Sequence, residues 1–259
     1  MRIGPPRGRR PLSLAVVLAV GGAIGLHVTS TVRPDPGRGR CHSALIPAYG
    51  GPDALVRLAE RPGRGRVVIV NPSNGPGVAA QPAYQRAIAA EQGAGATVLG
   101  YVHTGYGARD PAAVLADVRR YRSWYGIGGV FLDEAGHADE QLPYYRSIAG
   151  PLRASGERVV LNPGVVPVRG YFDIADIVVT FEGAATEYAA AVSRMPGRVR
   201  ALPRARVAHL VYSADDQQAM QAAGAGVAGY FYATSGALPD PWSTLPPYLE
   251  DLEARLEAC

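Results

Sequence analysis

The sequence contains no lysine, so all 26 of its basic residues are arginine. Seven of these arginines lie in residues 1–40, together with only one of the 22 acidic residues. The rest of the chain therefore has two more acidic than basic residues, and the formal charge of +4 arises from an excess of six positive charges in residues 1–40. Because the body of the chain has no basic field, we expect no nucleic-acid partner.

Several common catalytic motifs are absent from the sequence. The five histidines show no paired metal-ligand spacing, and no serine lies in a nucleophile-elbow pattern. The segment Gly75-Pro76-Gly77 lacks the lysine and hydroxyl residue of a phosphate-binding loop. We therefore expect no metal, no cofactor and no serine-hydrolase chemistry. His209 lies in the middle of a strand segment, which is typical of a core or helix-facing residue.

Cysteine is scarce, with only Cys41 and Cys259, one near each end of the region 41–259. A disulfide between them is permissible if the protein is exported, and it would join the ends of the domain. A closed barrel brings the first and last elements together, which is compatible with this pairing. Two separate free thiols are the alternative.

The N-terminus has the plan of an export signal. Met1 to Arg10 is basic and Leu12 to Val28 is apolar, which predicts a signal peptide or signal anchor over residues 1–30. Residues 31–40 are rich in proline, glycine and arginine and indicate a linker. We expect a secreted or extracellular membrane-anchored protein, which would contact a membrane only through an uncleaved anchor.

Apolar strand segments alternate with helical segments through residues 41–259, and the eight alternations predict a single (β/α)8 barrel. An open doubly wound sheet is the alternative, but no glycine-rich nucleotide motif follows the first strand. The expected strands cover residues 44–49, 66–70, 97–102, 128–132, 159–161, 177–181, 207–212 and 227–232. The expected helices cover residues 52–61, 83–92, 111–125, 140–154 and 186–194, one that begins near 215, and 247–257.

The fourth strand segment ends on two adjacent carboxylates, Asp133 and Glu134, and the sixth ends on Glu182. In a barrel, residues at the carboxyl ends of the strands face a common mouth where active sites form. Two carboxylates across a cleft are the equipment of a glycosidase. We expect Asp133 as nucleophile or base, Glu182 as general acid and Glu134 as an aid. Because neighbouring strand residues point opposite ways, one of Asp133 and Glu134 is expected to face away from the sugar.

Polar and aromatic residues near the same strand ends are expected to contact the substrate. They are Tyr49, Asn71, His103, Tyr106, Arg109, Asn162, Tyr212, Tyr232 and Trp242.

An ordered set of short motifs resembles the spherulin-4 family. The motifs span residues 71–77, 100–109, 124–125, 129–134, 162–164 and 181–182, and the resemblance covers roughly residues 44 to 235. The characterised microbial members of that family are glycoside hydrolases of family 135. The family's acidic pair falls on Asp133 and Glu134, and its later essential acid falls on Glu182. This chain departs from the family at Pro72-Ser73-Asn74-Gly75, where Pro-Asn-Ser-Gly is usual, and at His103, which occupies a variable place.

The resemblance implies a (β/α)8 barrel that cleaves a galactosamine- or N-acetylgalactosamine-containing exopolysaccharide. We expect a monomeric, endo-acting hydrolase whose partner is the polysaccharide. The alternative is a barrel that binds carbohydrate without turnover and serves cell-surface or matrix attachment. Release of reducing ends from an amino-sugar polymer separates these two hypotheses.

The absence of paired metal ligands generates a first prediction. Cleavage of an amino-sugar exopolysaccharide by purified residues 41–259 should be unchanged by EDTA, because two carboxylates suffice for glycoside hydrolysis. The measurement is reducing-end release before and after chelation. Loss of activity with EDTA, restored by a divalent ion, would contradict it.

Overall fold

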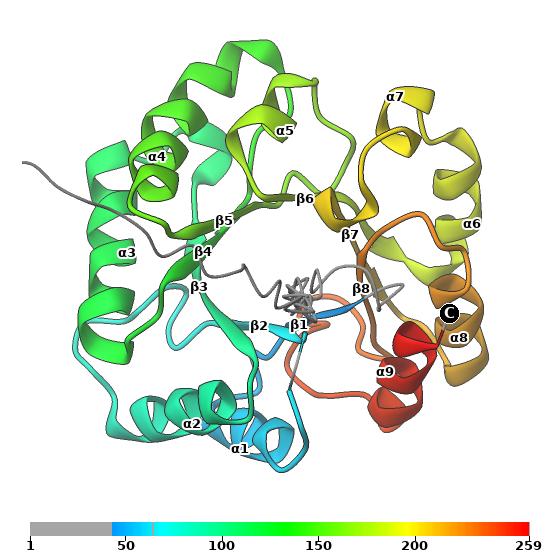
Figure 1. Cartoon of the computed structure of the whole chain (residues 1–259), viewed down its shortest axis with the longest axis horizontal. Helices are drawn as coiled ribbons and strands as arrows, with labels where there is room; N and C mark the ends of the chain where they lie inside the picture. Colours follow the sequence, from blue (N-terminus) through cyan, green and yellow to red (C-terminus); the bar gives the residue numbers. More distant parts are fainter. Residues whose placement is uncertain (1–42, 64, 259) are drawn as a thin grey trace, which may run out of the picture. The chain divides into compact units, whose positions relative to one another are not determined.

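Eight parallel strands form a closed barrel in their order along the chain (Figure 1). The structure is a computed structural model that describes residues 43–63 and 65–258. The strands are β1 (Ser43–Pro47), β2 (Val67–Val70), β3 (Thr97–His103), β4 (Gly129–Asp133), β5 (Arg158–Leu161), β6 (Ile177–Ala184), β7 (Val207–Tyr212) and β8 (Tyr230–Ala233). The predicted (β/α)8 barrel is confirmed, and pairing of β1 with β8 excludes the open sheet.

Helices surround the barrel (Figure 1). They are α1 (Pro52–Ala59), α2 (Pro82–Gly93), α3 (Pro111–Tyr125), α4 (Leu142–Ala154), α5 (Gly170–Ile174), α6 (Ala185–Arg194), α7 (Gly197–Arg200), α8 (Asp216–Ala223) and α9 (Leu249–Glu257). Three short 3₁₀ turns are η1 (Gly105–Gly107), η2 (Asp139–Gln141) and η3 (Arg204–Arg206).

Several elements differ from the expectation, among them the short α7, which was not expected. Only seven helices were predicted for the eight alternations. The helix missed between β5 and β6 is α5, whose five residues are too few to produce a helical pattern. β8 begins at Tyr230 instead of residue 227, because the Gly229 N–H donates to the Arg204 carbonyl of η3 over 2.8 Å. β6 continues to Ala184, so Glu182 lies within the strand and not after it.

α3 shows how the sequence sets one of these helices. The Asp110 side chain accepts a hydrogen bond from a backbone N–H of the first turn, and Pro111 is the first helical residue, as predicted. Gly126 ends the helix with φ 66, in the left-handed region. A Cβ at Gly100 would lie 2.4 Å from the Tyr121 ring, so the glycine lets α3 pack directly on β3.

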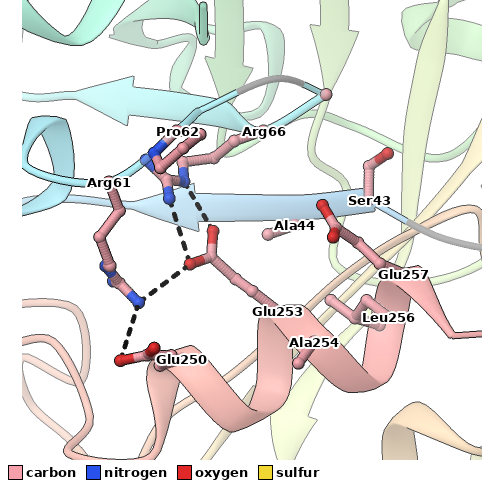
Figure 2. Close-up of a pocket in the computed structure, with 11 residues that line it drawn as sticks. Ser43, Ala44, Arg61, Pro62, Arg66, Glu250, Glu253, Ala254, Leu256 and Glu257 are labelled. Atoms are coloured by element: carbon pink, nitrogen blue, oxygen red, sulfur yellow. Dashed lines mark hydrogen bonds and ion pairs between the residues drawn. The ribbon is translucent and has the colours of Figure 1, made fainter. Parts of the chain in front are cut away.

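An ion cluster, buried at Arg66 and Glu91, joins the amino ends of the first strands to the last helix. Figure 2 shows Arg61, Arg66, Glu250 and Glu253 around a cavity of about 480 Å³. The Arg66 guanidinium donates to Glu253 Oε1 over 2.6 Å and to Glu91 Oε1 over 3.0 Å. Arg66 is 4% exposed and Glu91 is 0% exposed. The cluster therefore ties β2 to α2 and α9, at the end of the barrel where the strands begin.

Several predictions concern residues outside the part of the chain that the structure describes. These are the signal peptide or anchor over residues 1–30, the linker over residues 31–40, and Cys41 and Cys259. Over residues 43–63 and 65–258, no helix is both long enough and apolar enough to cross a membrane.

The ion cluster predicts a large loss of stability on removal of its cation. Arg66→Met leaves Glu91 buried without its charged partner, which should lower the free energy of unfolding by about 3–5 kcal/mol. Arg61→Ala is the control, because Arg61 pairs with Glu250 and Glu253 at the surface and should cost below about 1 kcal/mol. Urea unfolding measures both variants. Equal losses in the two would contradict the prediction.

Candidate active site

Three polar side chains meet at the carboxyl ends of β4, β5 and β6. Asp133 is the last residue of β4, Asn162 directly follows β5, and Glu182 lies in β6. The Asn162 amide nitrogen donates to Asp133 Oδ1 over 2.7 Å and to Glu182 Oε2 over 2.5 Å. Asn162 is 5% exposed. One buried amide thus joins the two carboxyls, which the sequence alone placed at the same mouth.

The orientation of the Asn162 amide follows from its own loop. Its Oδ1 accepts a hydrogen bond from the Gly164 N–H over 3.1 Å, so the amino group must face the carboxyls. Gly164 has φ 67, a left-handed conformation that glycine adopts without strain. The turn Asn162-Pro163-Gly164 therefore holds the amide in the one orientation that bonds both acids.

Burial raises the pKa of both bridged carboxyls. The pKa of Glu182 rises to about 7, first through burial and then through the charge of Asp133, while hydrogen bonds from Asn162 and Trp242 oppose the rise. Burial also raises the pKa of Asp133, opposed by hydrogen bonds from Asn162, the Glu134 backbone N–H and the Tyr101 hydroxyl. Asp133 accepts from three donors and Glu182 from two, which favours the negative charge of the pair on Asp133 and the proton on Glu182.

Glu134 is separated from this pair. It has φ 49, a left-handed conformation that is uncommon for a residue with a side chain and is often found at functional sites. Its carbonyl accepts hydrogen bonds from the Tyr106 N–H over 2.7 Å and from Thr104 Oγ1 over 2.8 Å. Its carboxylate lies 3.9 Å from Nδ1 of His103, and its side chain is 43% exposed. Asp133, and not Glu134, is therefore the acid that shares the Asn162 bridge.

Tyr101 is a site residue that the sequence analysis missed. Its hydroxyl hydrogen-bonds Asp133, and burial together with the Asp133 charge raises its pKa far above the usual range. Its ring packs edge-on against Tyr49, with ring centroids 5.5 Å apart. Tyr101 lies two residues before His103 in β3, and strand alternation places both on one face. That spacing was the signal that could have identified it.

Trp242 lies in the loop between β8 and α9 and is held among aromatic rings. Its indole N–H donates to Glu182. The ring centroids of Tyr212 and Tyr232 lie 6.3 Å and 6.0 Å from that of Trp242. Tyr232 is 0% exposed, so it supports Trp242 and offers no face to a sugar, contrary to the expectation of substrate contact.

Three further expected substrate contacts, Asn71, Tyr106 and Arg109, lie between the strands and the long helices. Asn71 Oδ1 accepts from the Gly75 N–H over 2.8 Å and shapes its own loop. The Arg109 guanidinium donates to the His103 carbonyl over 3.0 Å and pairs with Asp117, so it braces its own loop, and its contact with substrate stays a prediction. Tyr106 is 62% exposed beside Glu134 and keeps a ring face open to a ligand.

A cavity of about 680 Å³ lies beside β6, between the loop after β5 and α6. Glu182 lines this cavity, together with Gly164 and Arg194, whereas Asp133 does not. The short α5 contributes no residue to it. The cavity therefore borders Glu182 but not Asp133.

No metal site is evident in the described part of the chain, where no three His, Cys, Asp or Glu side chains are grouped to hold an ion. His209 is buried in β7, as expected for a core or helix-facing residue.

Comparison with known proteins places the chain in a family. The model of Spherulin4, described as spherulation-specific family 4, matches residues 45–255. The chain belongs to the Spherulin4 family. Spherulin-4 of Physarum polycephalum is 36% identical over 147 residues, which is 54% of this chain and 44% of that protein. The chain thus aligns with less than half of the length of this Spherulin4 relative.

The Spherulin4 fold also appears among solved structures. The crystal structure of Aspergillus clavatus Sph3 in complex with GalNAc superposes with a TM-score of 0.73 and 22% sequence identity. The match covers 85% of this chain and 99% of that one. At this identity the likeness establishes the barrel fold. The resemblance inferred from the sequence is confirmed, while the roles of the individual site residues stay predictions.

The raised pKa of Glu182 predicts a pH-dependent loss of stability. A carboxyl whose pKa is higher in the folded than in the unfolded protein stabilises the fold at low pH, and that contribution is lost as pH rises toward about 7. Glu182→Gln cannot ionise. The free energy of unfolding of the variant, relative to that of the wild type, should therefore rise by at most about 3 kcal/mol between about pH 4.5 and about pH 8.

Urea unfolding at the two pH values measures this gain. Glu187→Gln is the matched control, because Glu187 is an exposed carboxyl on α6. A difference between Glu182→Gln and wild type that is the same at both pH values would contradict the raised pKa.

Proposed function

We propose that this protein is a secreted glycoside hydrolase that cleaves within a galactosamine- or N-acetylgalactosamine-containing polysaccharide. The observation that carries the proposal is the partly buried Asp133–Asn162–Glu182 bridge, in which one amide nitrogen holds two carboxyls side by side. The GalNAc named with the Sph3 structure supports this sugar class. The basic and then apolar N-terminus supports export.

The two carboxyls take separate roles in the proposed reaction. Glu182 gives its proton to the glycosidic oxygen as the bond to the anomeric carbon breaks, and the leaving sugar departs as an alcohol. Asp133 attacks the anomeric carbon and forms a glycosyl ester. The Glu182 carboxylate then takes a proton from a water molecule, whose oxygen attacks the same carbon and releases Asp133.

The spacing of the carboxyls supports this two-step course. Because one nitrogen bonds both acids, the two bonded oxygens lie at most about 5 Å apart. Retaining glycosidases have carboxyl groups about 5–5.5 Å apart, whereas inverting enzymes need roughly 6.5–9.5 Å to admit a water molecule. We therefore expect the product to keep the anomeric configuration of the substrate.

The environment of each acid supports its role. Tyr101 and Asn162 donate to Asp133 and stabilise its charge, as a nucleophile requires. Burial keeps Glu182 protonated up to about pH 7, as a general acid requires. Tyr106 is 62% exposed and its N–H donates to the Glu134 carbonyl, so its ring is placed to stack on a sugar face.

Substitution of single acids tests the proposed roles. Glu182→Gln and Asp133→Asn should each lower kcat on an N-acetylgalactosamine-rich polymer by about 10²–10⁴-fold, while KM changes little. Glu134→Gln should have the smaller effect, because Glu134 does not share the Asn162 bridge. Reducing-end release gives the rates, and wild-type activity should fall as pH rises above about 7.

Proton NMR of the first product gives the anomeric configuration. Full activity in Glu182→Gln would overturn the assignment of the acid. Binding of the polymer by the wild type without any release of reducing ends would favour the non-catalytic carbohydrate-binding barrel.

A further inference from the structure

β6 contains an irregularity two residues before Glu182. Its pairing with β7 runs Val178 to Val207 and Val179 to Ala208, then skips Thr180 and resumes with Phe181 opposite His209. Thr180 is therefore the extra residue of a β-bulge. In a regular strand a shift of one residue moves every following side chain to the opposite face.

The bulge decides which face of the barrel receives Glu182. Residues paired across neighbouring strands share a face, so Phe181 lies on the face of His209, and Glu182 lies on the face of Leu210. The His209 face points outward, because both Phe181 and His209 contact the Tyr188 ring of α6. If β6 ran without the bulge, Glu182 would lie opposite Val211 and would point outward toward α6, away from Asn162.

A chain of buried hydrogen bonds holds the extra residue. Thr180 Oγ1 lies 3.0 Å from His209 Nε2, and His209 Nδ1 lies 2.9 Å from the Tyr188 hydroxyl. Thr180 is 3% exposed and His209 is 0% exposed. Burial lowers the pKa of His209 to about 4, so the imidazole is neutral and gives one donor and one acceptor. Each ring nitrogen then has one hydroxyl partner, and the network is closed.

We propose that Thr180 and His209 are positioning residues, which hold the β6 bulge and thereby aim Glu182 at Asp133 and Asn162. Thr180 has no paired residue in β7, so its side-chain hydroxyl is needed to hold it against that strand. The bond to His209 anchors it to the neighbouring strand. The activity side of the proposal rests on the proposed function, whereas the placement of Glu182 does not.

The placement of Glu182 can be measured without substrate. Trp242 donates to Glu182, and the sequence has only two tryptophans, so Trp124→Phe leaves Trp242 as the single reporter. Its fluorescence should change with pH as Glu182 ionises, with a midpoint near 7. Asp133, Asn162, Tyr49 and Tyr101 are the other polar groups close to this pair. Glu182→Gln in the same background must abolish the transition and so assigns it.

The test variant is Thr180→Val, which keeps the shape of the side chain and removes the hydroxyl. With Glu182 released from its buried contacts, the midpoint should fall by at least about one pH unit or the transition should vanish. On the polymer, kcat should fall at least roughly tenfold with little change in KM. Thr180→Ser retains the hydroxyl and should restore both values.

Ile148→Val in the buried face of α4 is the control for general loosening of the fold. It should leave the midpoint and kcat unchanged. If Thr180→Val does not fold, Thr180→Ala is measured in the same way. An unchanged midpoint in the hydroxyl-free variant, or an equal shift in Thr180→Ser or Ile148→Val, would overturn the proposal. A shifted midpoint in a protein that cleaves no polymer would uphold it and reject the glycosidase.

Discussion

The site depends on one amide nitrogen that lies between two partly buried carboxyls. Without a donor between them, Asp133 and Glu182 would face each other as like charges in a place that water solvates poorly, and the cost of keeping either ionised would be high. Asn162 donates to both and carries no charge of its own. It lets one carboxyl stay ionised while the other holds a proton, which is the condition for acid and nucleophile to coexist near neutral pH.

The barrel meets the geometric demands of this interaction with three consecutive strands. β4, β5 and β6 are hydrogen-bonded neighbours, so the residues at their carboxyl ends are within reach of one another. Each strand end needs a separate local device. After β4, the left-handed backbone of Glu134 turns its side chain away from Asp133. After β5, Gly164 orients the Asn162 amide, and in β6 the extra residue Thr180 turns the Glu182 side chain into the barrel. The fold provides proximity, and these three departures from regular geometry provide direction.

Much of this arrangement could be predicted from the residues alone. Strands buried on both sides appear as apolar runs, so their number and order indicate a barrel, and the acids at their ends indicate its mouth. Interactions that depend on register or on distant partners could not be predicted in this way. The bulge at Thr180 exists only relative to β7, and the pairing of Arg109 with Asp117 depends on how its loop folds back. Tyr232 resembled a mouth residue because burial depth along a strand has no signature in one sequence.

The way the barrel closes has a consequence for its synthesis. The second neighbour of β1 in the barrel is β8, and Arg66 pairs with Glu253, which lies 187 residues later in the chain. A growing chain therefore carries a sheet with two unpaired edges until residues 230–233 have been made, and such edges pair readily with other chains. Loss of the C-terminal residues would yield an open, association-prone sheet and not a smaller barrel. The carboxylate pair, complete once β6 has been made, would then sit in a molecule that has no closed interior to hold it.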